Sequence, residues 1–264
     1  MNLPPRVLII AGSDSGGGAG IQGDVKTATV LGAYAMTAVT AVTVQNTTGV
    51  ARTFPVPPDV VSDQIRTVLG DIGADGIKTG MLVSADIVKA VADALRTYRA
   101  PLVVDTVITA KGGAALLDDS GIDALRTYLF PLAALITPNI PEAEKLTGMS
   151  IASADAMVAA GEQLCKRGAR AVLVKGGHLS AESVTDILVM ESGVHRFSGV
   201  RLDNPATHGT GCALATAIAV GLAKQYPLPR AVESARDFVR GAIGAGLAFG
   251  RGTGPINHLH TAKE

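Results

Sequence analysis

Apolar positions along the chain alternate between two spacings, one typical of buried strands and one of amphipathic helices. Residues 6–12 (RVLIIAG) form a continuous apolar run that ends in glycine, which predicts a buried strand. The next segment, residues 19–34, repeats its apolar side chains at helical spacing. Residues 35–46 (AMTAVTAVTVQN) are rich in β-branched side chains and predict a second strand.

This alternation continues along the rest of the chain. Further strands are predicted at residues 76–80, 101–106, 133–139 and 170–177, with a hairpin at 185–199 that turns at 191–193. Helices are predicted at residues 57–70, 84–98, 152–167, 211–225 and 229–248, the second of them capped by Ser84. Regular strand–helix alternation without a linker predicts an α/β fold in one domain, residues 1–264, with a mainly parallel sheet and helices on both faces. Functional sites of such folds lie beyond the carboxyl ends of the strands.

Composition excludes several classes of function. The chain has 264 residues, of which 47% are hydrophobic and 17% charged, so disorder is excluded. Basic and acidic residues number 23 each and tryptophan is absent, so neither a basic surface nor a stacking platform for nucleic acid is expected. The apolar runs are too short for a leader peptide or a membrane span, and the two cysteines cannot form a disulfide framework. We therefore expect a cytoplasmic protein with no membrane or nucleic-acid partner.

A glycine-rich loop, GSDSGGGAGIQGD, follows the first strand at residues 12–24. It contains G-x-G-x-x-G between Gly18 and Gly23, but this motif begins several residues after the strand, and no acidic residue follows about 20 positions later. No Lys-Ser or Lys-Thr pair directly follows a glycine of this loop, so the loop is not a P-loop either. The remaining interpretations are a loop that packs closely on a ligand and a plain flexible turn.

A second glycine-flanked turn opens a long apolar helix at residues 209–212 (GTGC). The first N–H groups of a helix are unpaired and carry partial positive charge, so they attract anions and lower the pKa of a nearby thiol. Gly209, Thr210, Gly211 and Cys212 therefore predict an anion-binding turn with a reactive thiol. Cys165 lies in a helical apolar pattern and is interpreted as a small buried hydrophobe.

Polar side chains follow three of the predicted strands. Asp105 and Glu142 are placed to hold Mg²⁺ through oxygen or water, Asn139 lies beside Glu142, and Lys175 could neutralise a phosphate. The alternatives are a solvated first-turn glutamate and a lysine whose stem packs while its ammonium stays in water. No metal-ligand spacing relates the histidines that we considered for zinc, His178, His195 and His208. With the anion-binding turn, this set predicts a phosphotransferase on an α/β fold without a P-loop.

Six motifs in order resemble the ribokinase superfamily, namely AGSDSGGGAGIQGD, TVQNT, IKTGML, TPNIPEAE, VKGGH and HGTGC. The resemblance runs from about residue 6 to residue 259 and is closest to the hydroxymethylpyrimidine/phosphomethylpyrimidine kinases of thiamine biosynthesis. It implies a three-layer ribokinase-like fold, ATP as co-substrate, Mg²⁺ and a homodimer. It also implies phosphorylation of 4-amino-5-hydroxymethyl-2-methylpyrimidine and then of its monophosphate.

The resemblance also implies roles for individual residues. Gln45 would hydrogen-bond the aminopyrimidine edge, in a pocket shaped by Gly12, Asp24 and Met81. Asp105 and Glu142 would serve Mg²⁺ and the phosphates, Lys175 and Asn139 the ATP phosphates, and residues 209–211 would form an anion hole. Cys212 takes the position at which related sugar kinases, with G-A-G-D, have the catalytic aspartate. The C-terminal GRGTGPINH, residues 250–258, resembles the family's tail and is expected to contribute to the nucleotide site.

Three positions depart from the family pattern, and three other functions stay open. Thr106 stands where the family usually has proline, Gly23 where it has alanine, and Ala213 where it has threonine. The nearest alternative is a pyridoxal kinase of the same superfamily, although TVQNT and HGTGC favour the pyrimidine. The others are a non-catalytic pyrimidine or nucleotide sensor and, more distantly, a Rossmann oxidoreductase.

Overall fold

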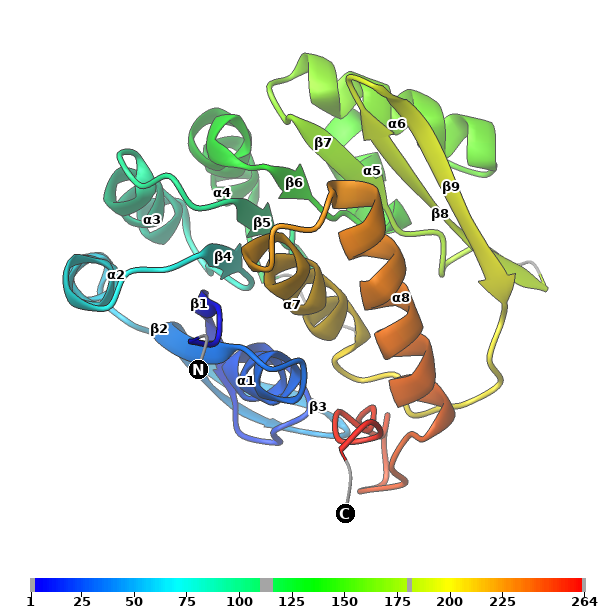
Figure 1. Ribbon diagram of the computed structural model, residues 1–264, viewed down its shortest axis with the longest axis horizontal. Coiled ribbons are helices and arrows are strands. Elements are labelled where there is room, and N and C mark those ends of the chain that lie inside the picture. Colours follow the sequence, from blue (N-terminus) through cyan, green and yellow to red (C-terminus); the bar gives the residue numbers. More distant parts are fainter. Residues whose placement is uncertain (1–2, 110–115, 180–181, 263–264) are drawn as a thin grey trace.

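The computed structural model of the chain describes residues 3–109, 116–179 and 182–262. Within these residues, one nine-stranded sheet forms the centre of the fold (Figure 1). In spatial order its strands are β3 (Gly49–Pro55), β2 (Tyr34–Asn46), β1 (Arg6–Asp14), β4 (Gly76–Thr79), β5 (Leu102–Val104), β6 (Leu135–Ile136), β7 (Ala171–Val174), β8 (Ser183–Met190) and β9 (Gly193–Val200).

The strands from β2 to β7 are parallel, whereas β3 and the β8–β9 hairpin add antiparallel edges. The apolar run of β1 is buried because β2 and β4 pair with it on either side and helices cover both faces. After β1 the chain moves to β2 on one side and then to β4 on the other. This reversal creates a crevice at the carboxyl ends of the central strands, where ligands bind in such sheets.

Helices cover both faces of the sheet (Figure 1). One apolar layer contains α2 (Pro58–Asp71), α3 (Ala85–Leu95), α4 (Asp119–Ala124), α5 (Ile140–Thr147) and α6 (Ala154–Lys166). The opposite layer contains α1 (Gly20–Val30), α7 (Thr210–Ala223) and α8 (Leu228–Gly244). A π-helical turn, Leu125–Leu129, and a 3₁₀ turn, Phe130–Leu132, extend α4. The predicted fold class is therefore confirmed.

Helix α7 is the central helix of its layer. Every residue from Ala213 to Gly221 is buried, because α1 and α8 flank the helix and β4 and β5 lie beneath it. This position explains the unbroken apolar sequence and brings the GTGC turn at the start of α7 to the carboxyl edge of the sheet. No helix in the described parts of the chain has the length and apolar composition needed to cross a bilayer.

Most predicted elements agree with the structure, but several differ, and helix α4 with the two turns that extend it was not predicted. Ser84 caps α3 as expected, its side chain accepting a hydrogen bond from the Ile87 N–H. Strand β3, which pairs with β2 at the sheet edge, was not expected from the sequence. The helix predicted at 229–248 ends at Gly244, where the chain turns back toward the start of α7.

Candidate active site

The side chains that follow β5 and β7 meet at the carboxyl edge of the sheet. The Lys175 ammonium lies 3.0 Å from Oδ1 of Asp105, and both side chains are largely buried. Thr137, at the end of β6, donates a hydrogen bond to the same Asp105 oxygen at 3.1 Å. The structure thus brings together a cation and a carboxylate that lie 70 residues apart in the chain.

Glu142 lies beside this pair, in the first turn of α5. It forms a capping box with Asn139, in which each side chain accepts a hydrogen bond at 2.9 Å from the backbone N–H of the other. Thr106 donates a further hydrogen bond at 3.1 Å to Oε2 of Glu142. The interpretation of Glu142 as a solvated helix residue is therefore wrong, because its side chain is buried against Thr106 and the turn of Asn139.

These buried charges shift one another's pKa values. Burial opposes ionisation of Asp105, but the charges of Lys175 and Lys78 outweigh it and hold the pKa of Asp105 below its usual range. Burial also opposes the charge of Lys175, yet Asp105 and Glu142 raise its pKa. At Glu142 burial dominates and, with the negative charge of Asp105, raises the pKa. The site therefore holds a firmly ionised Asp105–Lys175 pair and a more easily protonated glutamate.

The donor set limits which metal could bind. In the described residues no group of three or more His, Cys, Asp or Glu side chains is arranged around a common point. Both hydrogen bonds to the Glu142 side chain use Oε2. Two neighbouring carboxylates without a full protein cage fit Mg²⁺, which keeps several waters and binds largely through substrate phosphates.

The turn at the start of α7 faces the same pair. Gly209, the N-cap, has φ +89°, and a methyl group there would collide with the Gly18 carbonyl of the glycine-rich loop. A Cβ at Gly211 would lie 3.6 Å from the Lys175 ammonium and 3.8 Å from Oδ2 of Asp105. The first N–H groups of α7 have no partner within the helix. Together with Lys175 they place positive donors at one point, which is the arrangement expected of an anion site.

Cys212 differs from the expectation of a reactive thiol. Burial raises its pKa to about 11; Lys78 acts in the opposite direction, whereas Asp24 and Asp105 add to the rise. The prediction that the helix N-terminus lowers this pKa is therefore wrong, because burial and the two carboxylates raise it. Cys212 is a neutral thiol at pH 7.

Asp24 does not lie on the surface of a pocket. Its carboxylate is fully buried beneath the anion-binding turn, 2.7 Å from the Lys78 ammonium, and it accepts a 2.7 Å hydrogen bond from Thr216. The expectation that Asp24 shapes the substrate pocket is therefore corrected to a role beneath it. Lys78 was not predicted as a site residue, although a lysine inside the short apolar strand GIKTG was a visible signal.

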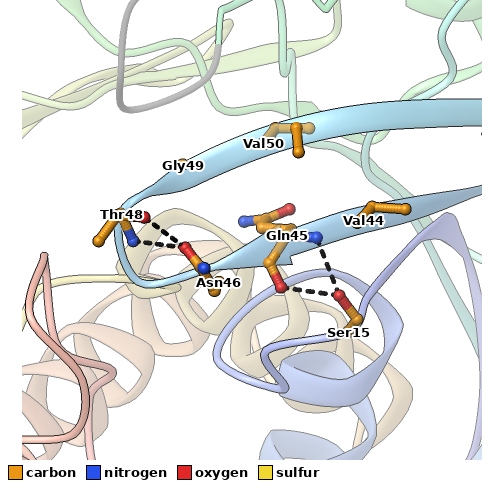
Figure 2. A pocket seen from close by; sticks show the side chains of 8 residues that line it. Ser15, Val44, Gln45, Asn46, Thr48, Gly49 and Val50 are labelled. Carbon is orange, nitrogen blue, oxygen red and sulfur yellow. Dashed lines mark hydrogen bonds between the residues drawn. The ribbon is translucent and has the colours of Figure 1, made fainter.

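A pocket of about 340 Å³ opens between the glycine-rich loop and the tip of the β2–β3 hairpin (Figure 2). Gln45 lines it, and Ser15 of the loop donates to the Gln45 carbonyl at 2.7 Å and accepts from its N–H at 2.9 Å. The complete lining is Ser15, Val44, Gln45, Asn46, Thr48, Gly49, Val50 and Ala51. Gly12 and Met81 contact each other but are not among the residues that line this pocket.

A second pair was also missed, Asp14 and His208. Their Oδ2 and Nε2 atoms are 2.8 Å apart, and Asp14 also accepts the backbone N–H groups of Gly16 and Ala19. Burial favours the protonated carboxyl, but these hydrogen bonds outweigh it and lower the pKa of Asp14. An aspartate two residues before a run of glycines is typical of such a turn, and this was the available signal. The pair links the glycine-rich loop to the anion-binding turn.

Comparison with known proteins shows the family of the chain. The family model for phosphomethylpyrimidine kinase matches residues 14–257. The hydroxymethylpyrimidine/phosphomethylpyrimidine kinase of Streptomyces coelicolor is 47% identical over 255 residues, covering 97% of this chain and 94% of that protein. The thiamine biosynthesis bifunctional protein of Geobacter sulfurreducens is 49% identical over 259 residues, covering 98% of this chain but 53% of that protein. The chain thus spans about half the length of this bifunctional relative.

A solved structure shows the same fold. The ADP complex of Bacillus subtilis pyridoxal kinase superposes with a TM-score of 0.92 at 34% identity, covering 99% of this chain and 100% of that one. The architecture is therefore ribokinase-like, as expected. From the family match and the two relatives near half identity, the chain is a phosphotransferase that belongs to the phosphomethylpyrimidine kinase family.

Proposed function

We propose that the chain transfers the γ-phosphoryl group of ATP to 4-amino-5-hydroxymethyl-2-methylpyrimidine and then to the resulting monophosphate. The main support is the Asp105–Lys175 pair, 3.0 Å apart, directly below the anion-binding turn of α7. Phosphoryl transfer depends mostly on positioning and charge stabilisation, and this cluster supplies both. The relatives' names supply the acceptor.

Lys175 and the first N–H groups of α7 stabilise the negative charge that develops on the transferred group. Asp105 holds Lys175 in place and keeps it charged. Asp105 and Glu142 would hold Mg²⁺, which when bound would neutralise phosphate charge. In this role Asn139 acts indirectly, because its side chain fixes the turn that carries Glu142.

Cys212 takes a permissive role in the proposed mechanism. A phosphate monoester has a second pKa near 6, so the second acceptor is already ionised at neutral pH and needs no strong base. A carboxylate at position 212 would repel this dianion, whereas a neutral thiol does not. We therefore assign Cys212 chiefly to admitting the charged acceptor, with a modest contribution to phosphorylation of the alcohol.

The acceptor would bind in the pocket beside Gln45, whose amide can donate to a ring nitrogen and accept from an exocyclic amine.

A homodimer in the cytoplasm completes the proposal. Val42 and Phe54 are directly paired across β2 and β3, and these residues are 48% and 68% exposed. Such an apolar edge is a surface that a second copy would cover, and light scattering after size exclusion would measure its mass.

Pyridoxal is the second candidate acceptor, because a pyridoxal kinase superposes with a TM-score of 0.92. The deciding experiment is a steady-state assay of ADP release with Mg·ATP, with hydroxymethylpyrimidine and pyridoxal as alternative acceptors and the mono- and diphosphate products resolved. We expect conversion of the pyrimidine to the diphosphate and poor use of pyridoxal. Turnover of pyridoxal alone would refute the assignment of Gln45. Binding of either acceptor without ADP release would indicate a sensor.

A further inference from the structure

The C-terminal segment beyond α8 runs back to the active site, and we call residues 247–258 the C-terminal strap. Its backbone pairs with His208, the residue that precedes the anion-binding turn. The His208 N–H donates to the Gly254 carbonyl at 3.0 Å, and the Ile256 N–H donates to the His208 carbonyl at 3.2 Å. These two bonds fix the strap to the loop that leads into α7.

The strap also contacts the tip of the β2–β3 hairpin. The Thr253 N–H donates to the Thr47 carbonyl at 3.0 Å, and the Gly252 N–H donates to Oγ1 of Thr47 at 3.3 Å. A Cβ at Gly252 would collide with the Thr47 carbonyl, so this approach requires glycine. Thr47 lies between Asn46 and Thr48, which line the pocket shown in Figure 2.

A third contact joins the strap to the glycine-rich loop and α1. A Cβ at Gly18 would lie 3.0 Å from Cβ of Pro255, and a Cβ at Gly23 would lie 3.3 Å from Nε2 of His258. His258 itself is almost fully buried. The strap therefore touches the two segments that line the acceptor pocket, the hairpin tip and the glycine-rich loop, and it also touches the loop before α7.

The contacts do not extend to the phosphate cluster. Within the described residues, none of the strap's hydrogen bonds reaches Asp105, Glu142 or Lys175. We infer that the strap positions the acceptor pocket, with Gly252 and Thr253 as positioning residues that hold the hairpin tip, and that it does not serve the nucleotide site. This inference rests on the proposed function and deepens it.

The test compares Gly252→Ala with Gly244→Ala, a control at the end of α8 where an added methyl group meets no atom within 4 Å. In Gly252→Ala we expect the KM for hydroxymethylpyrimidine to rise about three- to tenfold, the effect of one or two lost hydrogen bonds, while the KM for ATP stays within twofold. Amide hydrogen exchange at residues 46–50 should accelerate in the same variant. The control should match wild type in all three measurements.

A milder pair keeps the test valid if Gly252→Ala does not fold. Thr47→Val removes the acceptor for the Gly252 N–H, whereas Thr47→Ser retains it, so serine should restore the wild-type KM and exchange rates. A raised KM for ATP with an unchanged acceptor KM would overturn the inference, as would no change in KM or exchange. If wild type does not turn over the pyrimidine, the proposed function fails, but the exchange rates still test whether the strap holds the hairpin tip.

Discussion

The ion pair between Lys78 and Asp24 beneath the anion-binding turn allows a quantitative test of how the site is held. Neither side chain has exposed surface, their charged atoms are 2.7 Å apart, and Thr216 supplies one further hydrogen bond to Asp24. Burial opposes the charge of Lys78, but Asp24 and further negative groups together raise the pKa of the ammonium. At Asp24 burial dominates and raises the pKa of the carboxyl, although Lys78 acts in the opposite direction. We therefore treat the two groups as an ion pair at neutral pH.

Lys78→Met keeps the length of the side chain and removes its charge. The Asp24 carboxylate would then be buried with only the Thr216 hydroxyl as partner. Breaking a buried pair in this way costs about 3–5 kcal/mol, or roughly 6–20 °C in Tm for a domain of this size. Adding Asp24→Asn removes the unpaired charge, so the double variant should recover much of the lost stability.

Urea unfolding followed by far-UV circular dichroism would measure these free energies, since the chain has no tryptophan. The control is Lys89→Met, because Lys89 pairs with Asp86 on the exposed face of α3 at 3.7 Å and should matter little. The reasoning would be refuted if Lys78→Met cost no more than this control. Additive losses in the double variant would refute it equally, because they would show that the two buried charges do not depend on each other.

Three further predictions follow from the site. Cys212→Asp should slow phosphorylation of the monophosphate roughly 100-fold and phosphorylation of the alcohol much less, because a like charge about 5 Å away costs about 3 kcal/mol. Separate assays of the two steps would measure this difference. Equal slowing of both steps would contradict the prediction. Burial lowers the pKa of His258 to about 4, so wild type should lose at most about 3 kcal/mol of stability as the pH falls from about 6.5 toward 4. In urea unfolding across this range His258→Leu should lack that loss, and the exposed control His195→Leu should keep it. Gly209→Ala should abolish activity and lower Tm, because the φ of +89° is unfavourable for alanine and the added methyl group would collide with the Gly18 carbonyl. An active and equally stable variant would show that the turn rearranges.

The sequence was most informative where structure depends on local pattern. The apolar run of β1, the cap of α3 and the all-apolar α7 are visible over a few residues, and each was predicted. Parallel strands end at one edge of a sheet, so Asp105 and Lys175 were expected at the same edge, whereas how close they lie depends on the strand order. Their separation of 3.0 Å agrees with that expectation.

Features set by distant contacts could not be read from the sequence. Strand β3 is mostly exposed and has no apolar alternation, so only its pairing with β2 shows it to be a strand. Asp24 and Lys78 are 54 residues apart, and nothing local indicates that they share a buried position. The pKa of Cys212 depends on burial and charges contributed by three segments, so the local helix dipole gave the wrong direction.

The charges buried beneath the start of α7 explain why a cysteine occupies position 212. The cluster contains two ammonium groups, those of Lys78 and Lys175, and three carboxyl groups, those of Asp24, Asp105 and Glu142. A carboxylate at position 212 would add another negative charge where both an ATP phosphate and a phosphorylated acceptor must approach. A half-buried thiol with a pKa of about 11 adds none at pH 7. On this argument the neutral thiol and the buried Lys78 serve the same end, because each reduces the repulsion that an anionic acceptor meets at this turn.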